Sequence, residues 1–247
     1  MLAIFHKALA HPPKELNSPS SKLKIRNPSL PDVILRDFHS SHPENCISVT
    51  FSTGAAFSYV PSPSRLYSSF DDVHCVFLGS LDNLSSLINQ YGLCHKTNEA
   101  LFVIEAYRTL RDRGPYPADQ VIKDLDGTYA FVVYDHKTNI IFCALSGDGG
   151  IPLHWGIAAD GAVVISYELE IVKKSCGKSF GRFPAGCMFH SEGGLKSFEH
   201  PMKKMKAMPR VDSEGAMCGA NFNVDYYSHV EAIPRVGSAA DWTGWDV

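Results

Sequence analysis

The stretch from residue 121 to residue 171 constrains the fold of this chain most strongly. It predicts four strands, each rich in β-branched and aromatic residues and bounded by Gly, Asp or Asn, at 128–134, 140–145, 153–157 and 162–167. The short polar link between the first two strands predicts an antiparallel hairpin. Both strands of this hairpin contain continuous apolar runs, which indicates that both faces of the sheet are covered.

Two amphipathic helices are predicted before this sheet. The first begins after Asp82 or Asn83 and stops at Gly92, because Asp and Asn cap helix N-termini and Gly ends helices. The second begins after Thr97 or Asn98 and runs to residue 113. Its buried stripe has helical spacing and comprises Phe102, Val103, Ala106, Tyr107 and Leu110.

The rest of the chain predicts more strands and two irregular regions. The additional strands are expected at 46–51, 55–60, 73–78, 186–190 and 195–198. Residues 12–31, rich in Pro, Ser, Asn and Lys, are expected to form a surface loop, and the chain from residue 208 onward is expected to be rich in turns. Because the two helices lie between strand segments, the pattern alone predicts an α+β fold.

One domain is expected to span residues 1–225, followed by an aromatic tail at 226–247. The tail includes Trp242 and Trp245, whose rings would expose a large apolar area if they were left in water. We therefore expect the tail to pack on the body of the protein or on a neighbouring subunit. Because most oligomers of this kind are closed homo-oligomers, the tail also predicts self-association, which deletion of 238–247 should reduce.

The composition is that of an ordinary globular protein. The chain has 247 residues, of which 45% are hydrophobic and 20% charged, and its formal net charge is -3. This charge gives no basic footprint for nucleic acid, and no apolar run approaches the ~18 residues of a membrane span. Seven cysteines without short pairs favour a reducing compartment. Because the N-terminus lacks a signal-peptide pattern, we expect a cytoplasmic protein, which at this size can also enter the nucleus.

Several short motifs match known proteins in order and in spacing. Four of them are Leu125-Asp126-Gly127-Thr128-Tyr129-Ala130-Phe131, Pro152-Leu153-His154-Trp155-Gly156, Ser166-Tyr167-Glu168 and Phe183-Pro184-Ala185-Gly186-Cys187. They resemble motifs of class II glutamine amidotransferase domains, as in asparagine synthetases. Tyr91-Gly92-Leu93 and Leu110-Arg111-Asp112-Arg113 match the Y-G-L and L-R-D-R motifs that name a plant family of aluminium-induced, stem-specific proteins. That closer resemblance covers nearly the whole chain. We interpret the L-R-D-R run as a structural, basic helix C-terminus.

The resemblance implies a fold and a mechanism. The fold is the four-layer αββα sandwich of N-terminal-nucleophile hydrolases. The resemblance makes the short apolar stretch at 1–5 the first strand of the core, with its terminus pointing into the pocket. In the amidotransferases the first residue is a Cys, whose thiol attacks the glutamine carboxamide and whose own α-amino group is the base. An Asn side chain and a Gly backbone N–H stabilise the oxyanion. An Arg and an Asp hold the carboxylate and the amine of the substrate.

At the positions that perform this chemistry in the amidotransferases, the chain has different residues. Leu2 stands where the family has its Cys, and neither Met1 nor Leu2 can be an acyl-transfer nucleophile. A side chain of this size at residue 2 should also discourage removal of Met1. Leu78 replaces the Asn of the oxyanion pair, although Gly79 is kept. Asn98 replaces the Asp that helps to bind the substrate amine, so a carboxylate has become a neutral amide.

A fourth departure is at 144–146, where Ala-Leu-Ser replaces Ala-Arg-Asp. We therefore predict no catalytic residue and no cofactor. The remnant pocket is expected to comprise Met1, Leu78, Gly79 and Asn98. The expected protein is a stress-associated pseudoenzyme that binds a partner protein or a small ligand. Two alternatives stay open: an amide hydrolase with Cys75 or Cys218 as its nucleophile, and a structural self-assembling protein.

No metal site is predicted. The two weak groupings of ligating residues are Cys94 with His95, and His39 with His42 and Cys46. Cys75 and Cys143 lie in predicted strands, and we interpret them as small buried hydrophobes. Cys218 lies in a Met-Cys-Gly run that mimics the start of the amidotransferases, but it is internal, and we interpret it as part of a surface turn.

Overall fold

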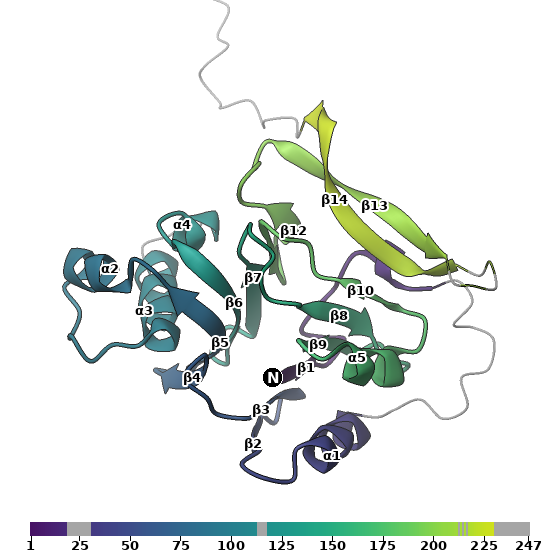
Figure 1. The fold of residues 1–247 in the computed structure, drawn as a ribbon, viewed down its shortest axis with the longest axis horizontal. Helices are drawn as coiled ribbons and strands as arrows, with labels where there is room; N and C mark the ends of the chain where they lie inside the picture. The colour runs from purple at the N-terminus through teal and green to yellow at the C-terminus, as the bar shows by residue number, and fades with distance from the viewer. Residues whose placement is uncertain (19–30, 113–117, 212, 214, 216, 230–247) are drawn as a thin grey trace, which may run out of the picture.

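Two antiparallel sheets lie face to face, with helices on both outer sides (Figure 1). The structure, a computed structural model, describes residues 1–18, 31–112, 118–211, 213, 215 and 217–229. Each of the two large sheets has six strands. The four layers are therefore helix, sheet, sheet and helix, which confirms the predicted α+β, αββα sandwich.

Sheet 1 contains the N-terminal strand near its centre, in the strand order β10-β8-β9-β1-β3-β2. Its strands are β1 (Leu2–Phe5), β2 (Ile47–Thr50), β3 (Ala55–Tyr59), β8 (His154–Ile157), β9 (Val163–Ser166) and β10 (Phe180–Arg182). Helices α1 (Pro31–Ser41) and α5 (Leu169–Cys176) cover its outer face. The first strand is thus held on both sides, by β3 and by β9.

Sheet 2 contains the hairpin that the central stretch predicts, in the strand order β12-β11-β7-β6-β5-β4. Its strands are β4 (Arg65–Phe70), β5 (Val73–Leu81), β6 (Gly127–Asp135), β7 (Ile140–Leu145), β11 (Cys187–His190) and β12 (Gly194–Ser197). Its outer face is covered by α2 (Leu84–Tyr91), α3 (Glu99–Arg111) and α4 (Asp119–Ile122). The hairpin β6–β7 is therefore buried on both faces, as its continuous apolar runs predict.

A two-stranded ribbon, β13 (Lys203–Val211) with β14 (Met217–His229), projects beside the sandwich (Figure 1). The prediction of a turn-rich chain from residue 208 onward is therefore wrong for the described residues up to 229, and the rest of that stretch lies outside the described residues. The base of the ribbon is held by tertiary contacts, because Ala220 and Phe222 are buried in the core between the sheets. Such contacts are invisible to a local pattern, in which Pro209 and the interspersed lysines argue against a strand.

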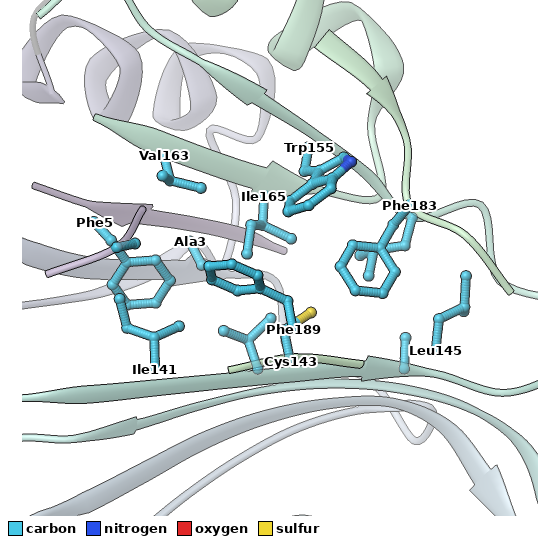
Figure 2. Close-up of a cluster of buried hydrophobic side chains, with 14 of the residues drawn as sticks. Ala3, Phe5, Ile141, Cys143, Leu145, Trp155, Val163, Ile165, Phe183 and Phe189 are labelled. Atoms are coloured by element: carbon cyan, nitrogen blue, oxygen red, sulfur yellow. The ribbon is translucent and has the colours of Figure 1, made fainter. Parts of the chain in front are cut away.

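The core between the two sheets is large and aromatic. Figure 2 shows Phe5, Trp155 and Phe183 on one side of it, above Cys143 and Leu145 of β7. Trp155 contacts three rings, with centroid distances of 5.1 Å to Phe183, 5.6 Å to Phe189 and 5.8 Å to Phe222. This core therefore ties together both sheets and the ribbon.

The side chains of β1 alternate between two cores. Met1, Ala3 and Phe5 point into the core between the sheets, whereas Leu2 and Ile4 point into the core between sheet 1 and helices α1 and α5. All five residues are 0% exposed. Because side chains alternate along a strand, residues 1 and 2 face opposite sides of sheet 1.

The helices correct several predicted boundaries. Asn83 and Asn98 precede α2 and α3 as predicted, and Gly92 ends α2 in the left-handed conformation. Helix α3 ends at Arg111 rather than at residue 113, which lies outside the described residues. Helices α1 and α4 are not predicted by any pattern in the sequence. Of the predicted stripe on α3, four residues are fully buried and Leu110 is half-buried.

The L-R-D-R run has a structural contact that its sequence does not reveal. Arg111 donates to the Oδ2 atom of Asp135 across 2.7 Å, and the Asp135 side chain is 0% exposed. The hydroxyl of Tyr107 donates to the same oxygen across 3.1 Å. Burial alone would raise the pKa of Asp135, but hydrogen bonds from Arg111 and Thr138 hold it below its usual value. The structural interpretation of this run is thus confirmed for Arg111.

The described end of the chain is exposed. Tyr226 and Tyr227 lie in β14 and are 61% and 99% exposed. The rest of the predicted aromatic tail, residues 230–247, lies outside the described residues. Within the described part of the chain, no helix combines the length and apolarity needed to cross a membrane.

Candidate functional site

The N-terminal end of β1 is buried at one end of the sandwich. Leu2 pairs with Ser58 of β3 and with Ser166 of β9. The hydroxyl of Ser166 is fully buried and donates to the carbonyl oxygen of Met1 across 2.8 Å. The backbone at the position where the resemblance requires a nucleophile is therefore firmly held.

The α-amino group of Met1 is an unusual base. Burial lowers its pKa from 8.0 to about 4, the nearby charge of Glu168 opposes this shift, and the charge of Arg65 adds to it. The amine is therefore uncharged at neutral pH, which is the form that a general base requires. The site keeps a base of the right kind but has no thiol beside it at residue 2.

Leu78 and Gly79 lie in β5 at the same end of the sandwich. Leu78 is 4% exposed and packs in the core between the sheets, together with Met1. Gly79 has a φ of +94°, and a Cβ added there would lie 2.0 Å from the carbonyl oxygen of Thr128, so only Gly fits. Its N–H donates to the carbonyl oxygen of Ser64 across 2.8 Å. The one oxyanion donor that the sequence keeps is already hydrogen-bonded.

The Asn98 side chain caps a helix in the layer outside sheet 2. Its Oδ1 atom accepts from the N–H of Leu101 across 2.8 Å, which caps helix α3, and from the hydroxyl of Ser68 across 3.2 Å. Of the four residues predicted for the remnant pocket, the structure thus brings Met1 and Leu78 into one core with Gly79 beside them. It gives the amide oxygen of Asn98 a capping role on the outer side of sheet 2.

A contact between Arg65 and Tyr167 joins the two sheets at this end, and sequence reasoning missed it. Arg65 pairs in register with Leu78, and Tyr167 directly follows Ser166. The Nη1 atom of Arg65 donates to the Tyr167 hydroxyl across 3.2 Å, and its guanidinium carbon lies 5.2 Å from the centre of the Tyr167 ring. No local pattern in the sequence distinguishes Arg65 from the other arginines, because its partner Tyr167 lies 102 positions away.

The cysteines of the rival hydrolase are enclosed. Cys75 is 0% exposed in the core between sheet 2 and its helices, and burial raises the pKa of its thiol strongly. Cys143 is buried in the core between the sheets, and its thiol pKa is likewise raised. Both match the prediction of small buried hydrophobes. Cys218 is 4% exposed within β14, so its predicted place in a surface turn is wrong.

The predicted weak metal groupings have other partners. His39 lies 2.6 Å from the hydroxyl of Ser48, and His42 lies 3.3 Å from the carboxylate of Glu168. The Sγ atom of Cys46 lies 3.2 Å from the hydroxyl of Ser58. Among the residues that the structure describes, no three His, Cys, Asp or Glu side chains gather in a way that could hold a metal ion.

Comparisons with known proteins agree with the motifs. A stem-specific protein of Nicotiana tabacum, TSJT1, is 37% identical over 148 residues, which are 58% of this chain and 99% of that protein. A glutamine-hydrolyzing asparagine synthetase of Sandersonia aurantiaca is 33% identical over 94 residues, which are 38% of this chain. The match covers only 18% of the synthetase, so the chain resembles one part of it.

A solved structure was also found to be similar. The glutamine phosphoribosylpyrophosphate amidotransferase of B. subtilis is 20% identical, with a TM-score of 0.44 over 59% of this chain and 35% of that chain. The family model described as aluminium-induced protein matches residues 2–224. Because this match spans most of the chain, the protein belongs to the aluminium-induced protein family.

Proposed function

We propose that this protein is a catalytically inactive relative of glutaminase domains that acts by binding. The observation that carries the proposal is Leu2, which stands at the nucleophile position and is 0% exposed. A leucine side chain cannot attack a carboxamide. In addition, it packs between sheet 1 and its helices, on the side of β1 opposite to the Met1 side chain.

The oxyanion positions support the same proposal. Leu78 has no hydrogen-bond donor in its side chain, and the N–H of Gly79 is bonded to Ser64. Removal of a single oxyanion donor typically lowers the rate by about 100- to 1,000-fold. Even with a nucleophile in place, this site would give a tetrahedral intermediate little stabilisation.

The proposed role is to bind a partner protein or a small ligand other than glutamine. Met1 and Leu78 fill the space between the sheets where a substrate would have to lie, and both are buried. The Arg65 to Tyr167 contact joins the sheets next to them. These contacts support a binding surface elsewhere on the molecule.

Ammonia release and calorimetric titration with glutamine test this proposal. The protein is first checked by mass spectrometry for an intact Met1, and an active class II glutaminase serves as the positive control. We expect neither ammonia nor heat of binding. Sustained glutamine turnover would overturn the proposal.

The alternative function, an amide hydrolase with Cys75 or Cys218 as its nucleophile, has little support. Cys75 is sealed in a core, and a thiol with a raised pKa is rarely in the thiolate form that attacks carbonyls. A Cys75→Ser variant and a Cys218→Ser variant would lose any amidase activity that depended on these thiols. If the wild type hydrolyses small amides and one of these two Ser variants does not, the amide-hydrolase alternative would be favoured.

Self-association is a second part of the proposal, and the ribbon supports it. Within the described residues, five of the eight exposed large hydrophobics lie in or beside the ribbon: Met202, Met208, Val211, Tyr226 and Tyr227. Met202, Tyr226 and Tyr227 lie toward one end of the ribbon and Met208 and Val211 toward the other, so the ribbon offers exposed apolar side chains to a second copy of the chain. We expect a closed homo-oligomer in light scattering, and a monomer at micromolar concentration would contradict this part.

A further inference from the structure

A groove runs between the edge of sheet 2 and the ribbon. It has a volume of about 470 Å³, and β12 and β13 form two of its walls. Its apolar lining consists of Pro13, Leu195, Pro201, Met205, Ala207 and Phe222. Strand β12 is the last strand of sheet 2, so the groove lies along a sheet edge that no further strand covers within the described residues. It is separate from the buried end of β1.

The rim of this groove is basic. Lys196, Lys203 and Lys204 line it, and Glu15 is the one acidic residue in its lining. The Nζ atom of Lys203 donates to the carbonyl oxygen of Tyr226 across 2.8 Å. Lys196 and Lys204 are exposed, and no carboxylate of the described residues forms an ion pair with either of them. The groove therefore offers two unpaired ammonium groups beside an apolar floor.

The chain itself contains a segment of complementary chemistry. Residues 230–247 carry three acidic residues, Glu231, Asp241 and Asp246, against the single base Arg235. In the sequence, Asp241 directly precedes Trp242, and Asp246 directly follows Trp245. Each indole thus has a carboxylate next to it, which suits a surface with ammonium groups around an apolar floor.

The described chain ends at the groove. His229, its last described residue, pairs in register with Lys203, which is part of the groove lining. Trp242 lies thirteen positions after His229, and an extended chain of this length spans up to about 45 Å. The segment is therefore long enough to reach every part of the groove without crossing to another molecule.

We propose that the groove between β12 and β13 is the docking site of this chain's own segment 230–247. Trp242 and Trp245 lie on the apolar floor formed by Leu195, Met205 and Phe222. Asp241 and Asp246 pair with the ammonium groups of Lys196 and Lys204.

Acrylamide quenching of tryptophan fluorescence in the full-length protein tests the proposal. The chain has three Trp residues, and Trp155 is 0% exposed. In the wild type we expect all three indoles to be shielded. In the double variant Lys196→Glu, Lys204→Glu, two of the three should become accessible. Raising the salt concentration should have the same effect, because it screens the ion pairs.

The matched control is Lys206→Glu. Lys206 lies on the same strand and is exposed, but it does not line the groove, so its reversal should leave the quenching unchanged. The variant Trp242→Phe, Trp245→Phe shows which indoles report the change. In this background, the lysine substitutions should no longer alter the acrylamide quenching. This pair of experiments stays informative if the double lysine variant fails to fold, because the salt dependence can be measured on the wild type.

Three results would overturn the proposal. The first is quenching of two indoles in the wild type as easily as in free tryptophan. The second is a Lys206→Glu variant in which two indoles become as accessible to acrylamide as in the double lysine variant. The third is loss of shielding on dilution in step with a fall in mass by light scattering, which would mean that the segment docks on a second copy of the chain.

Discussion

Arg65 and Tyr167 connect the two sheets at the end of the sandwich where Met1 is buried. The guanidinium of Arg65 donates to the Tyr167 hydroxyl across 3.2 Å and lies 5.2 Å from the centre of the ring. Arg65 belongs to β4 of sheet 2, and Tyr167 directly follows β9 of sheet 1. Tyr167 is also the middle residue of the Ser166-Tyr167-Glu168 motif.

A double-mutant cycle measures this contact. Arg65→Ala and Tyr167→Phe should each lower the free energy of unfolding. The cycle should give a coupling of about 1–2.5 kcal/mol, the sum expected for a half-exposed cation–π contact and a hydrogen bond. Urea denaturation is the measurement. A coupling near zero would mean that the two side chains only lie near each other.

The pair of Arg111 and Asp135 should matter far more. Asp135 is 0% exposed and Arg111 is 14% exposed, so Arg111→Ala leaves a buried carboxylate without its counter-ion. Loss of one partner from such a pair typically costs about 3–5 kcal/mol. We expect a loss of this size in urea denaturation. The matched control Arg108→Ala, which removes ion pairs to the more exposed Asp71 and Glu105, should cost less.

The Asp135 carboxylate should also make the free energy of unfolding depend on pH. Because the folded-state pKa of Asp135 is held below its usual value, the ionised group stabilises the fold above the unfolded-state pKa of about 4. This stabilisation is lost as the pH falls through the lower, folded-state pKa. The difference in unfolding free energy between wild type and Asp135→Asn should therefore be large at pH 7 and shrink below about pH 4. A difference that grows on acidification would contradict the sign of this shift.

The sequence predicted the buried parts of this fold well and the long-range contacts poorly. The strand at 140–145 matches β7, because its apolar run and its polar flanks are local features. The ribbon was missed because Phe222 is fixed by the core between the sheets, which no local pattern encodes. For the site, the replacements at Leu2 and Leu78 could be identified because the family resemblance assigns a Cys and an Asn to these two positions. The contact of Arg65 with Tyr167 could not, since 102 positions separate the two residues.

Replacing Leu2 by Cys should not restore glutamine hydrolysis. If the variant loses Met1, it regains a thiol and an α-amino base, but the side chain at residue 2 faces the helices of sheet 1. Leu78 still lacks a donor, and the N–H of Gly79 is still bonded to Ser64. Ammonia release by Leu2→Cys should stay at background. Strong activity of this single variant would mean that the site is more complete than the contacts indicate.

Two further changes, Leu78→Asn and Asn98→Asp, should differ in their effect on ammonia release. Leu78→Asn returns an oxyanion donor, although a buried amide without a partner costs about 1–3 kcal/mol of stability. Asn98→Asp returns a carboxylate and keeps the helix cap, because Asp caps as well as Asn. Because the Asn98 side chain caps α3 on the outer side of sheet 2, the triple variant Leu2→Cys, Leu78→Asn, Asn98→Asp should release ammonia no faster than Leu2→Cys, Leu78→Asn.

The most direct test of the central claim is ammonia release from glutamine by the unmodified protein. The sample should have Met1 confirmed by mass spectrometry, and its rate should be compared with that of a buffer blank and an active glutaminase. Because residue 2 is a buried Leu and neither oxyanion position offers a free donor, we predict a rate equal to the blank. Steady turnover that scales with protein concentration would contradict the account.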